Sequence, residues 1–170
     1  MIEKCYPDFC MDSVFSMDEE FFSKNNIKAV IFDIDNTLVK HTDKKPTREV
    51  LDFFAYLDSL GIKKGIISNN KRERVELFCE GLDIPYEYRA FKPRKKPLRK
   101  LLKAFDVEPQ SVLLVGDQLF TDIFGANRMG FVSVVVTAMG ENETGFVAFK
   151  RIFENMIMKS YIKSKNKAKK

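Results

Sequence analysis

The sequence has few of the residues that build metal knuckles, disulfide frameworks or membrane spans. Its 170 residues include three cysteines and one histidine. Cys5, Cys10 and Cys79 form an odd set without a CxxC motif, so we expect free thiols and no zinc site. No apolar run approaches the ~20 residues that a membrane span needs. The first residues also lack the apolar core of a signal peptide. The sequence therefore predicts a cytoplasmic chain without a transmembrane segment.

The net charge of +5 is modest, but the basic residues are unevenly placed. Eight of the 29 lysines and arginines lie between Arg89 and Lys103, and a second cluster runs from Lys159 to Lys170. Such clusters favour anionic partners: nucleic acid, an acidic lipid surface or phosphorylated substrates. We expect residues 1–158 to form a single domain and residues 159–170 to form a basic, disordered tail.

Short apolar strands alternate with amphipathic helices along the chain. The expected strands are 28–33, 62–68, 86–90, 112–116 and 132–137. The expected helices are 17–26 (capped by Ser16 or Asp18), 47–60 (capped by Thr47), one opened by Asn69 or Asn70, one near 97–105, 119–129 and 146–158. This alternation predicts an α/β fold, a Rossmann-like three-layer α/β/α architecture with a five-stranded parallel sheet.

Polar side chains gather where the predicted strands end. Asp33 and Asp35 follow the first strand, and Ser68, Asn69 and Asn70 follow the second. Lys92-Pro93 comes just after the third strand, and Asp117 comes directly after the fourth, with Asp122 five residues further on. Ligands of parallel sheets bind beyond the carboxyl ends of the strands. We therefore expect these residues to form one site at that edge.

The residue types at this edge indicate phosphoryl transfer at magnesium. Buried carboxylates repel one another unless a cation lies between them, and Mg²⁺ takes oxygen ligands, which Asp33 and Asp117 can supply. A carboxylate can also attack phosphorus, while a second carboxyl group, that of Asp35, protonates the leaving oxygen. Ser68 can hold phosphate oxygens, and Lys92 adds positive charge where negative charge builds up.

These residues carry a resemblance to a known family. The segments DIDNTL (33–38), SNN (68–70), KP (92–93) and GDQLFTD (116–122) resemble the four motifs of the haloacid dehalogenase-like (HAD) superfamily, in the form typical of its subfamily IIIA phosphatases. More narrowly, residues 6–153 are similar to the bacterial YqeG-like branch, whose mitochondrial relatives are phosphatidylglycerophosphate phosphatases. The segment from Pro7 to Phe15 fits that branch as well.

The resemblance implies a role for each aspartate. Asp33 is implied to be the nucleophile, with its other oxygen on Mg²⁺. Asp35 is implied to be the general acid and base, with its backbone carbonyl on the metal. Asp117 is implied to be a further Mg²⁺ ligand, and Asp122 to support the site through hydrogen bonds.

The resemblance also implies which residues handle the phosphoryl group. Ser68 and Asn69 would bind it, and Thr37 would brace the loop after Asp33 beside the phosphate. A lysine followed by proline would balance the charge, and both Lys92 and Lys96 have this form. We prefer Lys92 because its interval of 25 positions to Asp117 matches the family, with Lys96 as the alternative.

HAD enzymes usually carry a cap domain, and this chain has no room for one. Only eleven residues separate Asp35 from Thr47, and one helix and one strand separate Ser68 from Lys92. By the logic of the family, an uncapped site suits large substrates, or phosphates displayed on a polymer or a membrane. We therefore expect a HAD-like core without a cap domain, acting in the cytoplasm or peripherally at an anionic membrane.

The predicted function is that of a Mg²⁺-dependent phosphomonoester hydrolase acting through an aspartyl-phosphate intermediate. Phosphatidylglycerophosphate is the leading substrate candidate. Two alternatives stay open: a phosphatase acting on nucleic-acid 3′ ends or phosphoproteins, and a basic RNA- or ribosome-binding protein that makes little catalytic use of the site. The sequence does not fix the oligomeric state.

Overall fold

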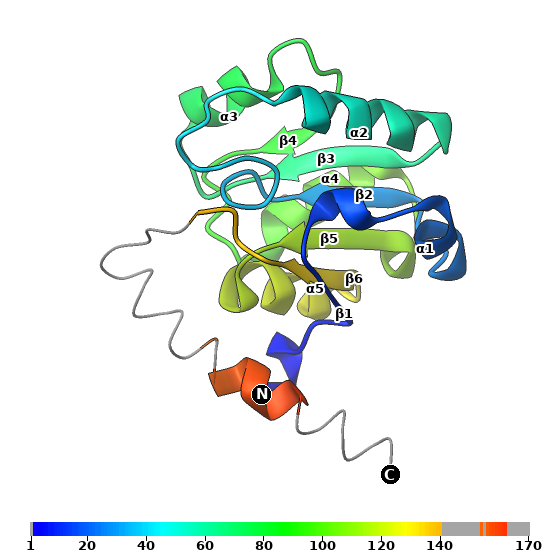
Figure 1. Ribbon diagram of the computed structural model, residues 1–170, viewed down its shortest axis with the longest axis vertical. Helices are drawn as coiled ribbons and strands as arrows, with labels where there is room; N and C mark the ends of the chain where they lie inside the picture. Colours follow the sequence, from blue (N-terminus) through cyan, green and yellow to red (C-terminus); the bar gives the residue numbers. More distant parts are fainter. Residues whose placement is uncertain (1, 141–153, 155, 163–170) are drawn as a thin grey trace.

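A sheet of six parallel strands forms the centre of the molecule (Figure 1). The computed structural model describes residues 2–140, 154 and 156–162. The strand order is β1-β6-β5-β2-β3-β4. The strands are β1 (Phe9–Met11), β2 (Ala29–Phe32), β3 (Lys63–Ile67), β4 (Tyr86–Glu87), β5 (Val112–Gly116) and β6 (Val132–Val136). Strands β2 and β5 lie in the middle, so their carboxyl ends adjoin.

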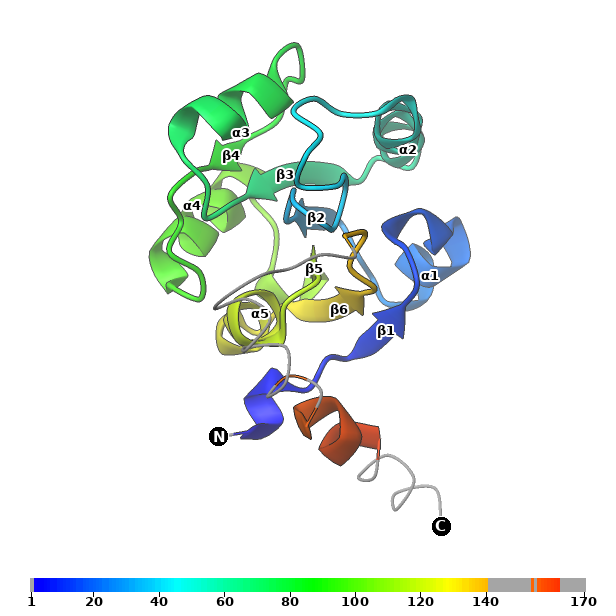
Figure 2. The same cartoon turned by 60° about the vertical axis from the view of Figure 1, so that its left-hand side comes forward.

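Helices cover both faces of this sheet (Figure 2). One face carries α1 (Glu19–Lys24), α2 (Arg48–Ser59) and α3 (Arg72–Cys79), and the other carries α4 (Lys95–Phe105) and α5 (Phe124–Met129). Short single turns are η1 (Ile2–Cys5), η2 (Val14–Ser16) and η3 (Pro109–Ser111), and a π-helical turn, η4 (Leu119–Ile123), leads into α5.

The pleat of β2 explains the two cores. Val30 and Phe32 belong to the cluster under α2, whereas Ala29 and Ile31 belong to the cluster under α4. Successive side chains of a strand point to opposite faces, so a central strand with both faces covered is apolar throughout. The predicted three-layer α/β/α architecture is confirmed.

Some helix boundaries follow the expected caps and others do not. Asp18 Oδ1 accepts a hydrogen bond from the Phe21 amide at 2.8 Å, and Thr47 Oγ1 accepts one from the Val50 amide at 3.4 Å. Helix α3 begins at Arg72, so the prediction that Asn69 or Asn70 opens it is wrong. Helix α4 begins at Lys95, two residues before the expected start.

The sixth strand, β1, was not predicted. It pairs with β6 in the register Phe9 with Val134 to Met11 with Val136. Asp8 helps to fix this edge, because its Oδ2 accepts hydrogen bonds of 2.8 Å from both the backbone amide and the hydroxyl of Ser133. The partners lie 125 positions apart, and three residues are too few to give a periodic signal. Strand β4 is also shorter than expected, because it covers residues 86–87 and the expected strand covers 86–90.

The predicted helix 146–158 lies mostly outside the described residues. Residues 156–162 are helical, so this helix continues past the position where we expect the basic tail to begin. It contacts the start of the chain, because the Tyr6 and Tyr161 ring centroids are 5.4 Å apart. Within the described part of the chain, no helix combines the length and apolar character needed to cross a bilayer.

Candidate active site

The register of the central strands places Asp33 beside Asp117. Phe32 pairs with Val115 across β2 and β5, so the residues that follow them leave the sheet side by side. The Asp33 amide still donates to the Val115 carbonyl at 3.0 Å. Consequently the two predicted motifs that carry carboxylates, residues 33–38 and 116–122, meet at the carboxyl edge of the sheet, as the sequence predicts.

Three buried carboxylates and one buried lysine form the centre of this edge. Carboxylate oxygens of Asp33, Asp117 and Asp122 lie within 4.8 Å of one another. Lys92 Nζ lies 2.7 Å from Asp33 Oδ1 and 2.7 Å from Asp122 Oδ1. If all four groups are ionised, the cluster has more negative than positive charge. The arrangement therefore fits an additional cation with oxygen ligands.

The pKa values reflect both burial and this excess of negative charge. The pKa of Asp33 is raised to about 7, first by burial and then by the carboxylates of Asp122 and Asp117, against the opposing effect of Lys92. Burial alone would lower the pKa of Lys92, but the negative charges of Asp122 and Asp33 outweigh burial and raise it. Lys92 is therefore a permanent cation, whereas Asp33 needs more positive charge to be fully ionised at neutral pH.

Asp122 lies in the π-helical turn η4 and makes contacts suited to a supporting residue. Its Oδ2 accepts a hydrogen bond from the Gln118 amide at 3.2 Å, while Oδ1 faces Lys92. The carboxyl group packs against Gly116, where a Cβ atom would come within 2.3 Å of Asp122 Cγ. Glycine at position 116 thus leaves the space that Asp122 needs.

Asp35 has surroundings quite different from those of Asp33. Its side chain is 19% exposed, and its Oδ1 accepts a hydrogen bond from Arg74 Nη2 at 2.9 Å. Its other oxygen contacts the side-chain amide of Asn70. Arg74 also donates to the backbone carbonyls of Asp43 and Lys44. Sequence reasoning missed Arg74, because a contact across 39 positions leaves no local signal.

The loop after Asp33 turns tightly around Thr37. Asn36 has a φ of 61°, and its amide donates to the Val39 carbonyl at 2.7 Å. Thr37 is buried, and its hydroxyl oxygen has no hydrogen-bond partner among the described residues. A buried hydroxyl without a partner is costly, so this group is suited to a ligand.

Ser68 and Asn69 connect the end of β3 to Lys92. Ser68 is buried, and its Oγ accepts a hydrogen bond from the Asn70 amide at 3.1 Å. Asn69 Oδ1 accepts a hydrogen bond from the Lys92 amide at 2.7 Å. The Asn69 side chain therefore positions the lysine loop, and its predicted binding of phosphate stays a prediction.

The structure distinguishes the two Lys-Pro pairs. Lys92 is buried against the carboxylates, whereas Lys96 is exposed and lines a groove of about 340 Å³ on the outside of the molecule. Only the first of the two lysines can reach Asp33 in this arrangement.

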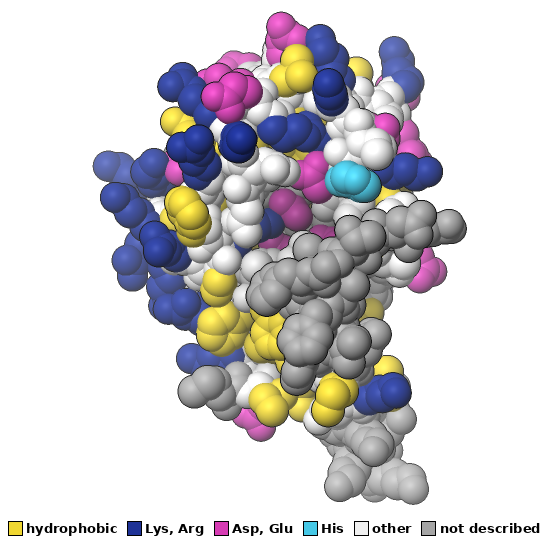
Figure 3. All heavy atoms as spheres, turned by 90° about the vertical axis from the view of Figure 1, so that its left-hand side faces the viewer, with side chains coloured by type: hydrophobic (Ala, Val, Ile, Leu, Met, Phe, Trp, Pro, Cys, Tyr) yellow, Lys and Arg dark blue, Asp and Glu magenta, His cyan; other side chains and the backbone are white. Residues whose placement is uncertain are grey.

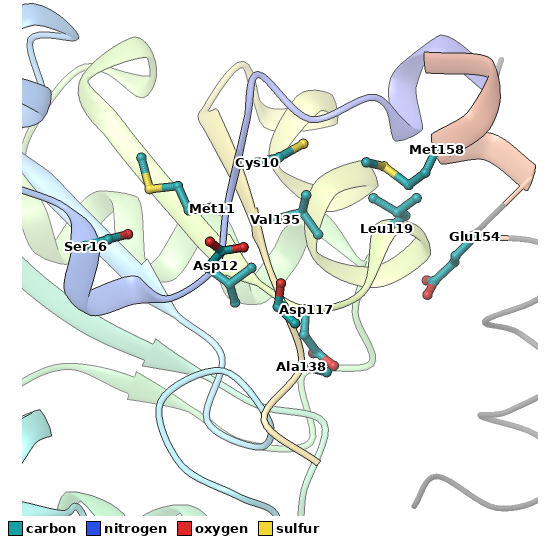
Figure 4. A pocket seen from close by; sticks show the side chains of 12 residues that line it. Cys10, Met11, Asp12, Ser16, Asp117, Leu119, Val135, Ala138, Glu154 and Met158 are labelled. Carbon is teal, nitrogen blue, oxygen red and sulfur yellow. The ribbon is translucent and has the colours of Figure 1, made fainter. Parts of the chain in front are cut away.

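A larger cavity of about 600 Å³ lies beside Asp117. Figure 4 shows side chains of β1, β6 and the segment after β5 around it. The described lining includes the apolar side chains of Leu119, Val135, Ala138 and Met158 and the carboxylates of Asp12, Asp117 and Glu154. The cavity therefore adjoins the acidic cluster at Asp117.

Comparison with known proteins defines the class. Residues 40–130 match the haloacid dehalogenase-like hydrolase family, a range that includes Ser68, Lys92, Asp117 and Asp122. The chain belongs to this family of hydrolases. Along 159 residues it is 33% identical to YqeG of Bacillus subtilis (strain 168), described as a probable phosphatase, with 93% of this chain and 92% of that protein covered. It is accordingly an enzyme of the phosphatase type.

Solved structures have the same fold. A HAD phosphatase from Thermococcus onnurineus superposes with a TM-score of 0.55 at 17% identity, covering 70% of this chain and 90% of that one. A subfamily IIIA hydrolase of the HAD superfamily from Legionella pneumophila gives 0.51 at 22% identity, covering 71% of each. At these identities the likeness concerns the fold alone.

Proposed function

We propose that this protein is a Mg²⁺-dependent phosphomonoester hydrolase that acts through a phosphorylated Asp33. The observation that carries the proposal is the buried cluster of Asp33, Asp117 and Asp122 around the ammonium group of Lys92. Burying several carboxylates beside one cation is unfavourable for stability, and such groups are typical of functional sites.

The residues present fit a magnesium ion. The cluster offers only oxygen ligands, carries excess negative charge, and holds Asp33 at a raised pKa. Asp33, Asp117 and the backbone carbonyl of Asp35 would hold the ion. When bound, it would neutralise negative charge on the phosphoryl oxygens.

Asp33 and Asp35, in the loop after β2, have different roles: Asp33 is the nucleophile and Asp35 is the general acid and base. A carboxylate oxygen of Asp33 attacks phosphorus, and the bond from phosphorus to the leaving oxygen breaks while Asp35 gives that oxygen a proton. Asp35 then takes a proton from water, the water oxygen attacks phosphorus, and the bond to Asp33 breaks. Phosphate leaves, and both aspartates return to their first state. Hydrogen bonds from Arg74 and Asn70 hold the Asp35 carboxyl group in position for these proton transfers.

Four neighbouring residues balance the charge and bind the phosphoryl oxygens. Lys92 stays protonated and offsets the charge that builds up in the transition state. The unpartnered hydroxyl of Thr37 and the hydroxyl of Ser68 are suited to hold phosphoryl oxygens. Asn69 fixes the lysine loop through its bond to the Lys92 amide and contributes to phosphate binding through its own place at the end of β3.

We further propose phosphatidylglycerophosphate as the substrate, hydrolysed in the cytoplasm at a membrane surface. Three features support a large, partly apolar ester. Neither described connection, 36–47 or 69–91, holds a cap domain. The cavity beside Asp117 is lined in part by apolar side chains. Basic side chains gather along one side of the hollow that contains the carboxylates (Figure 3). The same basic residues would also suit nucleic-acid 3′ phosphates or phosphoproteins, which belong in the test.

The test is a panel of phosphomonoesters with and without Mg²⁺: an aryl phosphate, phosphatidylglycerophosphate in detergent, a 3′-phosphorylated oligonucleotide and a phosphopeptide. Asp33→Asn should lower aryl phosphate hydrolysis by about 10⁴-fold or more and leave the fold intact, as measured by circular dichroism. The matched control, Asp83→Asn, changes an exposed carboxylate and should keep full activity. Equal activity in Asp33→Asn would refute the nucleophile, and RNA binding without any turnover would favour a binding protein.

A further inference from the structure

One exposed aromatic side chain stands directly beside the proposed catalytic lysine. Phe91 is 61% exposed, although its two neighbours in the chain, Ala90 and Lys92, are buried. Tyr88 is also exposed, at 36%. Contiguous exposed apolar surface with polar residues around it is a feature of interaction sites, and Tyr88 and Phe91 line the same groove.

The outward position of Phe91 is fixed by the rest of the site. The Arg89 amide donates to the Asn70 carbonyl, the Ala90 amide to the Ser68 carbonyl, and the Lys92 amide to Asn69 Oδ1. Both Arg89 and Phe91 have left-handed backbone, with φ values of 43° and 49°. This conformation is unfavourable for side chains other than glycine, and such strain is typical of functional positions.

Cations surround the two exposed rings. We define the docking patch as Tyr88, Arg89, Phe91, Arg94, Lys96 and Lys100, which line one groove on the outside of β4 and the start of α4. Within it, only Lys100 forms a described ion pair, with Glu87 at 3.0 Å. The patch therefore offers apolar surface and positive charge together, in the segment that contains Lys92.

Each of the two exposed rings has a guanidinium group beside it, an arrangement that suits insertion at an anionic lipid surface. The Arg94 guanidinium lies 5.1 Å from the Phe91 ring centroid, and that of Arg72 lies 5.6 Å from the Tyr88 centroid. Each ring therefore has a guanidinium over one face. Insertion at a bilayer surface needs an apolar side chain with cations at its base, which this arrangement provides.

We propose that the docking patch binds the surface of an anionic bilayer, with Phe91 entering the boundary between headgroups and acyl chains. Phe91 and Lys92 are adjacent, so docking would bring the open site to the level of lipid headgroups. The biological role of this docking rests on the proposed function, because the patch would bring the active site to the phosphate group of a lipid substrate. Docking itself needs no catalysis.

The test is sedimentation of the full chain with vesicles of phosphatidylcholine, alone or mixed with phosphatidylserine, which carries no phosphomonoester. The protein should bind only the anionic vesicles, and more weakly as salt is raised. Phe91→Ala should weaken binding about tenfold. Arg94→Glu with Lys96→Glu should weaken it about a hundredfold or more, because each cation near acidic lipid contributes about fivefold.

Matched controls lie elsewhere on the molecule. Leu51→Ala removes another exposed apolar side chain, 38% exposed on α2, and Lys24→Glu with Lys28→Glu makes the same change of charge near α1. Both should bind vesicles as the wild type does. All patch variants should hydrolyse a soluble aryl phosphate at the normal rate, which shows that they fold.

Several outcomes would overturn the proposal: equal binding by Phe91→Ala and the wild type, binding to neutral vesicles, or tighter binding of single-stranded RNA that also depends on Phe91. Asp33→Asn should still bind anionic vesicles. If vesicles bind as expected but no phosphomonoester is hydrolysed, the proposed function fails alone. If esters are hydrolysed and vesicles do not bind, the docking proposal fails alone.

Discussion

The two ends of the same central strands are built on different principles. At the amino end, the Lys28 amide donates to the Ser111 carbonyl at 2.8 Å, and Asn26 Nδ2 donates to Ser111 Oγ at 3.3 Å. These are neutral hydrogen bonds. At the carboxyl end, the ionisable groups of Asp33 and Lys92 are buried beside two further carboxyl groups.

Comparison of the two ends indicates that the residues at the carboxyl end serve function more than stability. A neutral hydrogen bond contributes about 1 kcal/mol to folding. Replacing buried ion pairs by apolar groups of similar size is often neutral or stabilising. The charges at the carboxyl end are therefore not needed to hold the sheet together. Substitutions there should lower activity as well as stability, whereas substitutions at the amino end should lower stability alone.

Among the substitutions that compare the two ends of the strands, Lys92→Met should give the largest effect. It leaves Asp33 and Asp122 without their buried cation, so we expect hydrolysis of an aryl phosphate to fall about a thousandfold. The free energy of unfolding should fall by about 3 kcal/mol in the absence of Mg²⁺. Steady-state kinetics and urea unfolding measure the two effects.

Lys96→Met is the control for that substitution, because it removes the other lysine that precedes a proline. Lys96 is exposed, so both activity and stability should stay close to the wild type. A larger loss in Lys96→Met than in Lys92→Met would reverse the assignment of the two lysines.

Gly116→Ala should come next. The added Cβ would lie 2.3 Å from Asp122 Cγ, so the carboxyl group must move away from Lys92. We expect activity to fall about a hundredfold and stability by about 2 kcal/mol. At Gly125 in α5 the added Cβ would meet Leu98 Cδ1 at 3.5 Å, an ordinary contact, so Gly125→Ala should preserve activity. Similar kinetics in both variants would contradict the tight fit at Gly116.

Stability should depend on pH through Asp33. Its pKa is about 7 in the folded protein and near 3.8 in the unfolded chain, so the folded state binds more protons between these values. Without metal, stability should therefore fall by about 2 kcal/mol as pH rises from about 5 to about 7. Urea unfolding in chelator should show this fall in the wild type and much less of it in Asp33→Asn. Added Mg²⁺ should remove it, since the ion favours the ionised carboxylate.

The smallest effects come from a matched pair of buried serines at opposite ends of the strands. Ser111→Ala removes the acceptor of the Asn26 bond, and Ser68→Ala removes the acceptor of the Asn70 amide. Each should lower stability by about 1 kcal/mol. Only Ser68→Ala should lower activity, about tenfold or more, and an equal loss in Ser111→Ala would remove the contrast between the two edges.

Local signals in the sequence predicted most of the sheet and the acidic cluster. The apolar runs that became β2 and β5 are continuous because both faces are covered, and the residues directly after them had to meet at one edge. The missed features depend on distant partners. Strand β1 is defined by β6, and Arg74 reaches Asp35 only because α3 folds back over the loop at 43–44. The roles of the individual site residues stay predictions until the kinetics above are measured.

Strand β1 also constrains the order in which the molecule can be completed. Residues 9–11 leave the ribosome first among the strands, yet their partners are residues 134–136, in the last strand of the sheet. Strand β1 therefore cannot pair within the sheet until residues 134–136 have been synthesised. A nascent chain that stalls before residue 134 would leave Phe9 and Met11 without their partner strand.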